Sequence, residues 1–143
     1  MSKIVLYGFD GSTYVRTVRM LLAEKAASYE LVPVNVLKGE PREPAHLARH
    51  PFGKVPVLDH DGFRVLETSA IAPYLDEVLP GPSLTPDNPK DRARMRMAMS
   101  FVDSYGYGAY TRGWVTSLFG AARVTGRDPR DTGSSCGSPE VKC

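Results

Sequence analysis

Residues 7–18 read YGFDGSTYVRTV and join an apolar run to a helical pattern. The run IVLY at residues 4–7 is short and continuously apolar, which is typical of a central strand covered on both faces. Through residues 13–26, apolar side chains recur at helical spacing, at Val15, Val18, Leu22 and Ala26. Between strand and helix lies a turn whose hydroxyl residues, Ser12 and Thr13, can cap the helix.

A second strand, a hairpin and a second helix follow. Residues 31–36 alternate, and Pro33, which lacks an N–H donor, favours an edge strand. Residues 55–58 and 63–66 are predicted antiparallel strands around a four-residue loop, 59–62. Thr68 or Ser69 can cap a helix ended by Pro80-Gly81, and a cap at Ser69 would cost Pro73 only the first intrahelical bond. The order is therefore βαβ, a loop-rich crossover, and ββα.

The second half of the chain has a weaker pattern. Residues 81–90 are rich in Pro and polar residues and are predicted to be a linker. A helical stripe follows over residues 91–105, formed by Met95, Ala98, Met99 and Val102, and glycines at 106, 108 and 113 then interrupt it. Residues 126–143 are mostly Gly, Pro, Ser and charged residues and are predicted to be disordered. The predicted organisation is a domain at 1–80, a linker at 81–90, a helical segment at 91–125 and a tail at 126–143.

Composition excludes several classes of protein. The net charge of +2 over 143 residues is too small to indicate a nucleic-acid partner, and the apolar runs are too short to cross a membrane. The cysteines, Cys136 and Cys143, indicate neither a disulfide framework nor a cysteine-based metal site, so a reducing cytoplasm is expected. Three scattered histidines do not suggest a metal site either.

The element order and two segments, PFGKVPVL at 51–58 and LETSAIAPYLD at 66–76, resemble the glutathione transferase family. STYVRTVRMLLAEK and PAHLARHPFGKVP look more narrowly like its phi-type, serine-using members, and the resemblance spans roughly residues 2–110. It implies an α/β thioredoxin-like domain with a mixed four-stranded sheet, followed by an all-helical domain. Because that domain normally takes over half of a longer chain, the helical part here is expected to be short and truncated.

The resemblance implies that Ser12 is the catalytic hydroxyl, which would hold the thiol of glutathione as a thiolate. From the residues alone, a plain helix cap is the favoured interpretation of Ser12, and the resemblance reverses that preference. Thr13 is the neighbouring alternative donor, and Tyr7 is another because other classes of the family use a tyrosine at the end of the first strand.

The resemblance also implies a set of glutathione-binding residues. Val55-Pro56 matches the family's cis-proline motif, whose backbone would pair with the cysteinyl backbone of the peptide, although a trans proline is the ordinary state. The remaining contacts would come from Glu67 and Thr68 at the γ-glutamyl end and from Lys54 and Arg42 at the glycine carboxylate. Phe52 resembles the aromatic side chain that family members insert into a partner subunit.

The function implied is a glutathione transferase that uses glutathione as cosubstrate, without a further cofactor, acts on a small hydrophobic electrophile and forms a homodimer. The electrophile would lie near Met99, Tyr105 and Tyr110. The main alternative is a non-catalytic glutathione-binding or interaction module, because the helical part is truncated. Glutathione-dependent peroxide reduction and a partner-dependent fragment are further alternatives, whereas dithiol exchange is not expected because no cysteine lies near Ser12.

Overall fold

A computed structural model describes residues 2–111 of the chain. These residues belong to two compact units. The boundary between the units along the chain lies between Pro86 and Asp87, within the segment predicted to be a linker. Residues 112–143 lie outside the described part, and with them the predictions for the tail at 126–143 and for the end of the helical segment.

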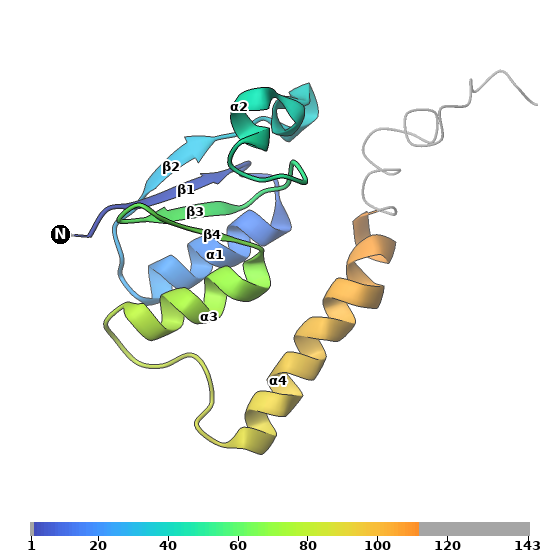
Figure 1. The fold of residues 1–143 in the computed structure, drawn as a ribbon. Helices are drawn as coiled ribbons and strands as arrows, with labels where there is room; N and C mark the ends of the chain where they lie inside the picture. The colour runs from blue at the N-terminus through green and yellow to red at the C-terminus, as the bar shows by residue number, and fades with distance from the viewer. Residues whose placement is uncertain (1, 112–143) are drawn as a thin grey trace, which may run out of the picture. The chain divides into compact units, whose positions relative to one another are not determined.

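The first unit contains a four-stranded sheet (Figure 1). Its strands are β1 (Ile4–Gly8), β2 (Glu30–Pro33), β3 (Val57–His60) and β4 (Phe63–Leu66), in the spatial order β2-β1-β3-β4. β1 pairs with β2 in parallel and with β3 antiparallel, and β3 pairs antiparallel with β4. The predicted mixed, thioredoxin-like sheet is confirmed.

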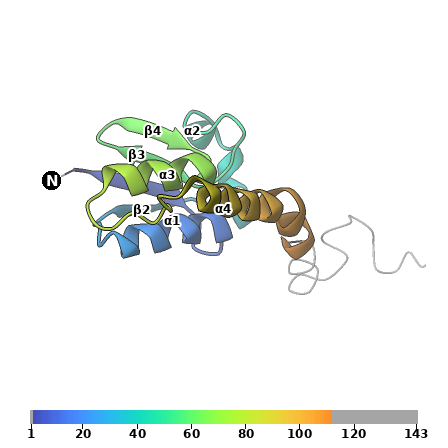
Figure 2. The same cartoon turned by 90° about the horizontal axis from the view of Figure 1, so that it is seen from below.

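Helices α1 (Thr13–Glu24) and α3 (Thr68–Val78) pack against one another on one face of the sheet (Figures 1 and 2). A cluster of buried apolar side chains fills the space between these helices and the sheet. It is formed by Ile4, Leu6, Val15, Val18, Leu22, Leu58, Ile71, Leu75 and Leu79. The predicted apolar face of α1 is therefore the face that the structure buries, at Val15, Val18 and Leu22.

The crossover between β2 and β3 is built from three short helical turns. These are η1 (Val36–Lys38), η2 (Glu40–Arg42) and α2 (Pro44–Leu47). The prediction of a strand over residues 31–36 was wrong at both ends, because β2 begins at Glu30 and ends at Pro33. The Asn35 side chain accepts hydrogen bonds from the N–H groups of Leu37 and Lys38, and this cap turns the chain out of the sheet.

The β3–β4 hairpin has a two-residue turn, so the predicted four-residue loop was wrong. Asp59 and His60 pair with Arg64 and Phe63 in the ladder, and only Asp61 and Gly62 form the turn. Both have positive φ, 49° and 85°, which is the backbone that a tight hairpin of this hand requires. The Asp61 carboxylate also accepts a hydrogen bond from the N–H of Lys3, at 2.7 Å.

Helix α3 begins one residue earlier than the sequence suggested. Glu67 is the N-cap residue and Thr68 is the first helical residue, so neither Thr68 nor Ser69 is the cap. Pro73 therefore lies inside the helix rather than in its first turn. The helix ends at Val78, just before Pro80-Gly81, as expected.

A buried ion pair joins α1, α3 and the segment that follows α3. Lys25 Nζ lies 2.7 Å from Asp76 Oδ1, and both side chains are at most 4% exposed. Asp76 also accepts hydrogen bonds from the N–H groups of Leu84 and Thr85, and Lys25 donates to the carbonyl of Pro82. The first part of the predicted linker is thus fixed to the first unit.

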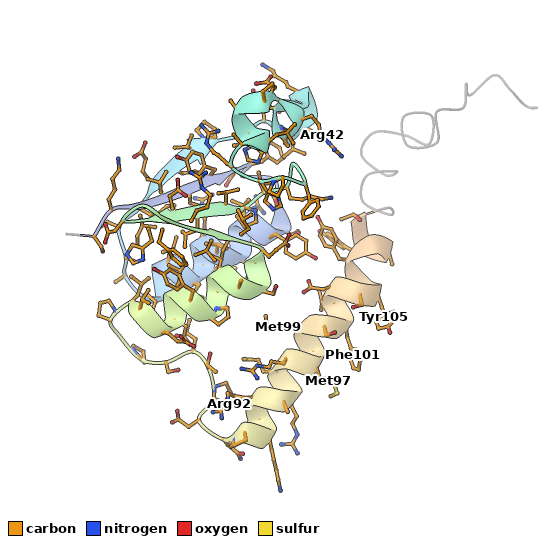
Figure 3. The ribbon with its side chains drawn as sticks, in the orientation of Figure 1. Arg42, Arg92, Met97, Met99, Phe101 and Tyr105 are labelled. Atoms are coloured by element: carbon orange, nitrogen blue, oxygen red, sulfur yellow. The ribbon has the colours of Figure 1, made fainter. Side chains whose placement is uncertain are left out.

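The second unit begins with α4 (Pro89–Phe101), which continues as η3 (Val102–Gly106), a turn of π-helix. The Asn88 side chain caps α4 at the N–H of Lys90, so the helix starts two residues before the predicted position. Gly106 and Gly108 do not interrupt it, because helix continues over residues 107–111. Met97, Phe101 and Tyr105 lie along one side of this helix (Figure 3). Within residues 2–111, no helix is both long and apolar enough to span a bilayer.

Candidate functional site

Three loops emerge at one edge of the sheet. Tyr7 of β1 pairs with Val57 of β3, and Val57 pairs with Leu66 of β4, so these three residues lie in one row across the sheet. β1 and β4 end beside this row, and β3 begins there. The loop that leads to Ser12, the Val55-Pro56 segment and Glu67 therefore share this edge, where α1 and α3 also begin (Figure 1).

Ser12 is the N-cap of α1, and its hydroxyl accepts a hydrogen bond from the N–H of Val15 at 3.4 Å. An accepting hydroxyl keeps its own O–H to donate, so the cap and the thiol-binding interpretations are compatible. The cap is brought close to the sheet by Gly8, where an added Cβ would lie 2.6 Å from the Val15 side chain. The preceding turn is held by Arg19, which pairs with the Asp10 carboxylate, and by Arg16, which donates to the Asp10 carbonyl at 2.8 Å.

Tyr7 belongs to a different cluster of side chains. The Arg49 guanidinium lies over its ring, 4.6 Å from the ring centroid. A hydrogen bond from Tyr7 also contributes to the lowered pKa of Asp59, for which the hydrogen bond from Arg64 is the largest cause. These contacts occupy the Tyr7 side chain and favour Ser12 over Tyr7 as the donor to a thiol.

The Val55–Pro56 peptide bond is cis, as the motif predicted. Pro56 is buried, and Val55 is half-buried against the core. The loop before it is anchored by His46, whose Nε2 lies 2.8 Å from the carbonyl oxygen of Lys54. The position of the Val55 backbone is therefore determined by packing on both sides of the motif.

Arg42 and Lys54 lie on neighbouring stretches of backbone. Gly53, with a φ of 57°, lies so close to the η2 turn that an added Cβ would be 2.6 Å from the Pro41 carbonyl oxygen. The same position would be 3.3 Å from Cδ of Arg42. Both cationic side chains are exposed, and Arg42 lies on the turns between β2 and β3 (Figure 3). Two exposed cations beside one loop form a suitable contact for a carboxylate.

Glu67 has an unusual backbone conformation at the start of α3. Its φ is 68° and its ψ is 126°, a region that a residue with a Cβ rarely adopts. Its carbonyl accepts the first helical bonds, from Ala70 and Ile71, but no side chain caps the helix. The first N–H groups of α3, including that of Thr68, therefore lack an intrahelical acceptor, and the helix start can bind a carboxylate.

Comparison with known proteins identifies the family. Residues 6–83, more than half of the chain, match the family model described as glutathione S-transferase, N-terminal domain. This chain belongs to the glutathione S-transferase family. It is 43% identical over 101 residues to maleylacetoacetate isomerase of Rhizobium meliloti, a match that covers 71% of this chain and 47% of that protein. It is 42% identical over 72 residues to glutathione S-transferase 4 of Zea mays, covering 50% of this chain and 32% of that protein.

A solved member of the family has a similar fold. The glutathione transferase homologue of Drosophila mojavensis, determined with bound glutathione, aligns with a TM-score of 0.68 at 30% identity. The alignment covers 73% of this chain and 48% of that one. The chain spans about half the length of the curated relatives it matches. Those relatives include both transferases and isomerases, so the comparisons identify the family without identifying the phi-type, serine-using class.

His50 lies beside the candidate site, next to Glu67, and was not predicted from the sequence. Its side chain is 1% exposed, Nδ1 accepts a hydrogen bond from the N–H of Phe52 at 3.3 Å, and Nε2 lies 3.7 Å from Oε1 of Glu67. Burial lowers its pKa, against the opposing effect of Glu67. The available signal was its position directly before PFGKVP, the segment that carries the resemblance.

Phe52 lies in the same loop and is 70% exposed, with its ring edge-on to His50. The residues expected near the electrophile, Met99, Tyr105 and Tyr110, belong to the second unit and are exposed there. Their role and the role of Phe52 stay predictions.

Proposed function

We propose that the first unit binds glutathione at the shared edge of the sheet and stabilises its thiolate there. The observation that carries the proposal is the row formed by Tyr7, Val57 and Leu66. Because of this register, a helix-capping hydroxyl, an anchored backbone segment and an uncapped helix start meet at one edge. Each of these features has a partner in the extended tripeptide.

The tripeptide would be bound along its length. The backbone of Val55 pairs with the cysteinyl residue in the manner of an added strand. The start of α3, at Thr68, takes the carboxylate of the γ-glutamyl end, and Glu67 takes its ammonium group. Arg42 and Lys54, which flank Gly53, take the glycine carboxylate.

Ser12 would donate a hydrogen bond to the sulfur. A free thiol has a pKa of about 8.5, so only about 3% of it is ionised at pH 7. Lowering that pKa by roughly two units requires about 2.7 kcal/mol. A hydrogen bond to a charged acceptor contributes ~1.5–3 kcal/mol and a helix N-terminus ~0.3–1 kcal/mol. Ser12 at the start of α1 is therefore strong enough for the task without acting as a nucleophile.

The reaction proposed is attack of the bound thiolate on an electrophilic carbon of a small hydrophobic molecule. A second candidate is a glutathione-dependent isomerase, which the likeness to maleylacetoacetate isomerase favours. A thiolate that adds reversibly to a conjugated double bond turns it into a single bond, which can rotate before the thiolate leaves. Both reactions need the same stabilised thiolate. A homodimer formed through Phe52 and a cytoplasmic location complete the proposal.

The test is titration of the full chain with glutathione by calorimetry at several pH values. A second titration, in which the ultraviolet absorbance of the bound thiolate is measured against pH, gives the pKa of the bound thiol. Binding with proton release near neutral pH is expected. Ser12→Ala should raise the pKa of the bound thiol by about one to two units, from the loss of one charge-assisted hydrogen bond. Thr13→Ala, the neighbouring hydroxyl, and Tyr7→Phe are the matched controls and should leave that pKa in place.

If the pKa of the bound thiol stayed low in Ser12→Ala but rose in Tyr7→Phe, Tyr7 and not Ser12 would be the residue that stabilises the thiolate. Assays with chlorodinitrobenzene and with a conjugated cis-diacid then separate transferase from isomerase. Tight binding of glutathione without either activity would identify a non-catalytic glutathione-binding module.

A further inference from the structure

His50 is a buried polar residue beside the proposed glutathione site, and none of the proposed contacts to glutathione involves it. The N–H of Phe52 donates to its Nδ1, so the neutral ring must carry its proton on Nε2. That nitrogen is the ring atom that faces Glu67, 3.7 Å from Oε1. The backbone of the loop thus selects the tautomer that presents an N–H to the carboxylate.

Glu67 needs such a partner more than an ordinary surface glutamate does. Its positive φ directs the chain sharply into α3, and its side chain, 63% exposed, caps no helix N–H. A long, solvated side chain samples many rotamers unless a fixed group holds it. The His50 ring is fixed, since it is buried and held at Nδ1.

Among the charged groups around His50, Glu67 is the anion with which an ammonium group could pair. The groups that act on it are Glu67, Lys54 and His46. Burial keeps the pKa of His50 below its usual value, so the ring is neutral at pH 7 and above. A neutral ring offers an N–H to Glu67 without adding a cation that would repel the ligand.

We propose that His50 is a positioning residue that orients the Glu67 carboxylate toward the α-ammonium group of the γ-glutamyl residue. The inference rests on the glutathione site proposed above and deepens it. His50 acts through Glu67 and does not itself touch the ligand. Because its other nitrogen binds the N–H of Phe52, it also links the exposed loop at Phe52 to the ammonium site.

Two amide variants separate the two nitrogens of His50. The asparagine amide reaches about as far as Nδ1, so His50→Asn keeps an acceptor for Phe52 and removes the group that faces Glu67. The glutamine amide reaches about as far as Nε2, so His50→Gln keeps a donor for Glu67. His60→Asn is the matched control, because His60 contacts Tyr74 through Nδ1 and lies away from Glu67 in the same sheet.

The measurement is calorimetric affinity of the full chain for glutathione and for its desamino analogue, glutaryl-cysteinylglycine, at pH 7.5. The wild-type chain should prefer glutathione. His50→Asn should reduce that preference about tenfold, the value of one charge-assisted contact, and leave the affinity for the analogue unchanged. His50→Gln should retain the preference within about twofold, and His60→Asn should leave it intact. In a Glu67→Gln background, His50→Asn should have no further effect on the preference.

Equal loss of affinity for both tripeptides in His50→Asn would overturn the inference, since it would indicate a purely structural role. A preference that Glu67→Gln abolishes and His50→Asn leaves intact would overturn it as well. Failure of the wild-type chain to bind either tripeptide would instead overturn the proposed function, and this inference with it. Circular dichroism of each variant identifies any that fails to fold, and His50→Gln then supplies the decisive comparison.

Discussion

At the scale of single residues, Glu67 combines a strained backbone with a proposed role in binding. Its φ of 68° costs of order 1–3 kcal/mol in a residue with a Cβ, and glycine would relieve that cost. We expect Glu67→Gly to raise the free energy of unfolding by about 1 kcal/mol, after the added entropy of the unfolded chain is subtracted. The same variant should weaken glutathione binding, because it lacks the carboxylate. Urea unfolding and calorimetry measure the two effects.

Glu67→Gln is the control for this prediction, since it keeps the Cβ and removes only the charge. It should weaken binding without the gain in stability. If both variants unfolded at the same urea concentration as the wild type, the backbone at Glu67 would not be strained in solution.

Gly8 is the residue that lets α1 approach β1. An added Cβ would lie 2.6 Å and 2.7 Å from the two methyl carbons of Val15, which is fully buried. We expect Gly8→Ala to destabilise the first unit by about 1–3 kcal/mol, as overpacking of a core does. Chemical denaturation measures the loss. In the double variant Gly8→Ala/Val15→Ala the two effects should be less than additive, whereas additive effects would show that the two side chains do not compete for space.

At the scale of elements, the Lys25–Asp76 pair decides how α1, α3 and the segment 82–85 are held together. Lys25→Met leaves the Asp76 carboxylate buried without its counter-ion. We expect a loss of about 3–5 kcal/mol in the free energy of unfolding, the usual cost of breaking a buried pair from one side. Lys25→Met/Asp76→Asn should recover part of it, because no buried charge then remains.

The exposed pair Arg94–Asp91 is the matched control, with the same ion-pair distance of 2.7 Å. Because both of its side chains are solvated, Arg94→Met should cost less than about 1 kcal/mol. If Lys25→Met and Arg94→Met lowered the free energy of unfolding by similar amounts, burial would not determine the strength of the Lys25–Asp76 pair.

At the scale of the whole molecule, His50 and Asp76 should divide the pH dependence of stability into two windows. Burial lowers the pKa of His50 in the folded state. Below about pH 6.5 the unfolded chain therefore binds more protons at this residue than the folded chain does, and stability decreases as the pH is lowered. For Asp76, burial raises the pKa, but the hydrogen bonds from Lys25, Leu84 and Thr85 outweigh it and hold the pKa well below its usual range. Its contribution is therefore present above about pH 4 and lost below that value.

Urea unfolding between pH 7.5 and 3 measures both windows. His50→Gln should flatten the fall just below about pH 6.5 and leave the acid limb in place. Asp76→Asn should lower stability at every pH, because it leaves Lys25 buried without its counter-ion, but of the two limbs it should flatten only the acid one. A variant of either residue that changed both limbs equally would contradict this assignment.

Local patterns were sufficient to predict most of the first unit. Apolar runs, helical spacing and the position of Pro33 specify short strands, α1 and an edge strand because each depends on residues near in sequence. The errors occurred where one hydrogen bond or dihedral angle decides a boundary, as at the Asp61-Gly62 turn and at Glu67, where φ rather than residue type moved the helix start.

By itself, the sequence determined the order of elements, the apolar face of α1, the family resemblance and the candidate residues from Ser12 to Thr68. Periodicity and motif spacing are properties of the chain, and they need no knowledge of what lies across the sheet. Only the tertiary structure decided that Ser12, Val55 and Glu67 share one edge, that Tyr7 is occupied by Arg49, and that His50 faces Glu67. Those relations depend on strand register and on side chains brought together from distant segments, which become neighbours only when the core between the sheet and its helices closes.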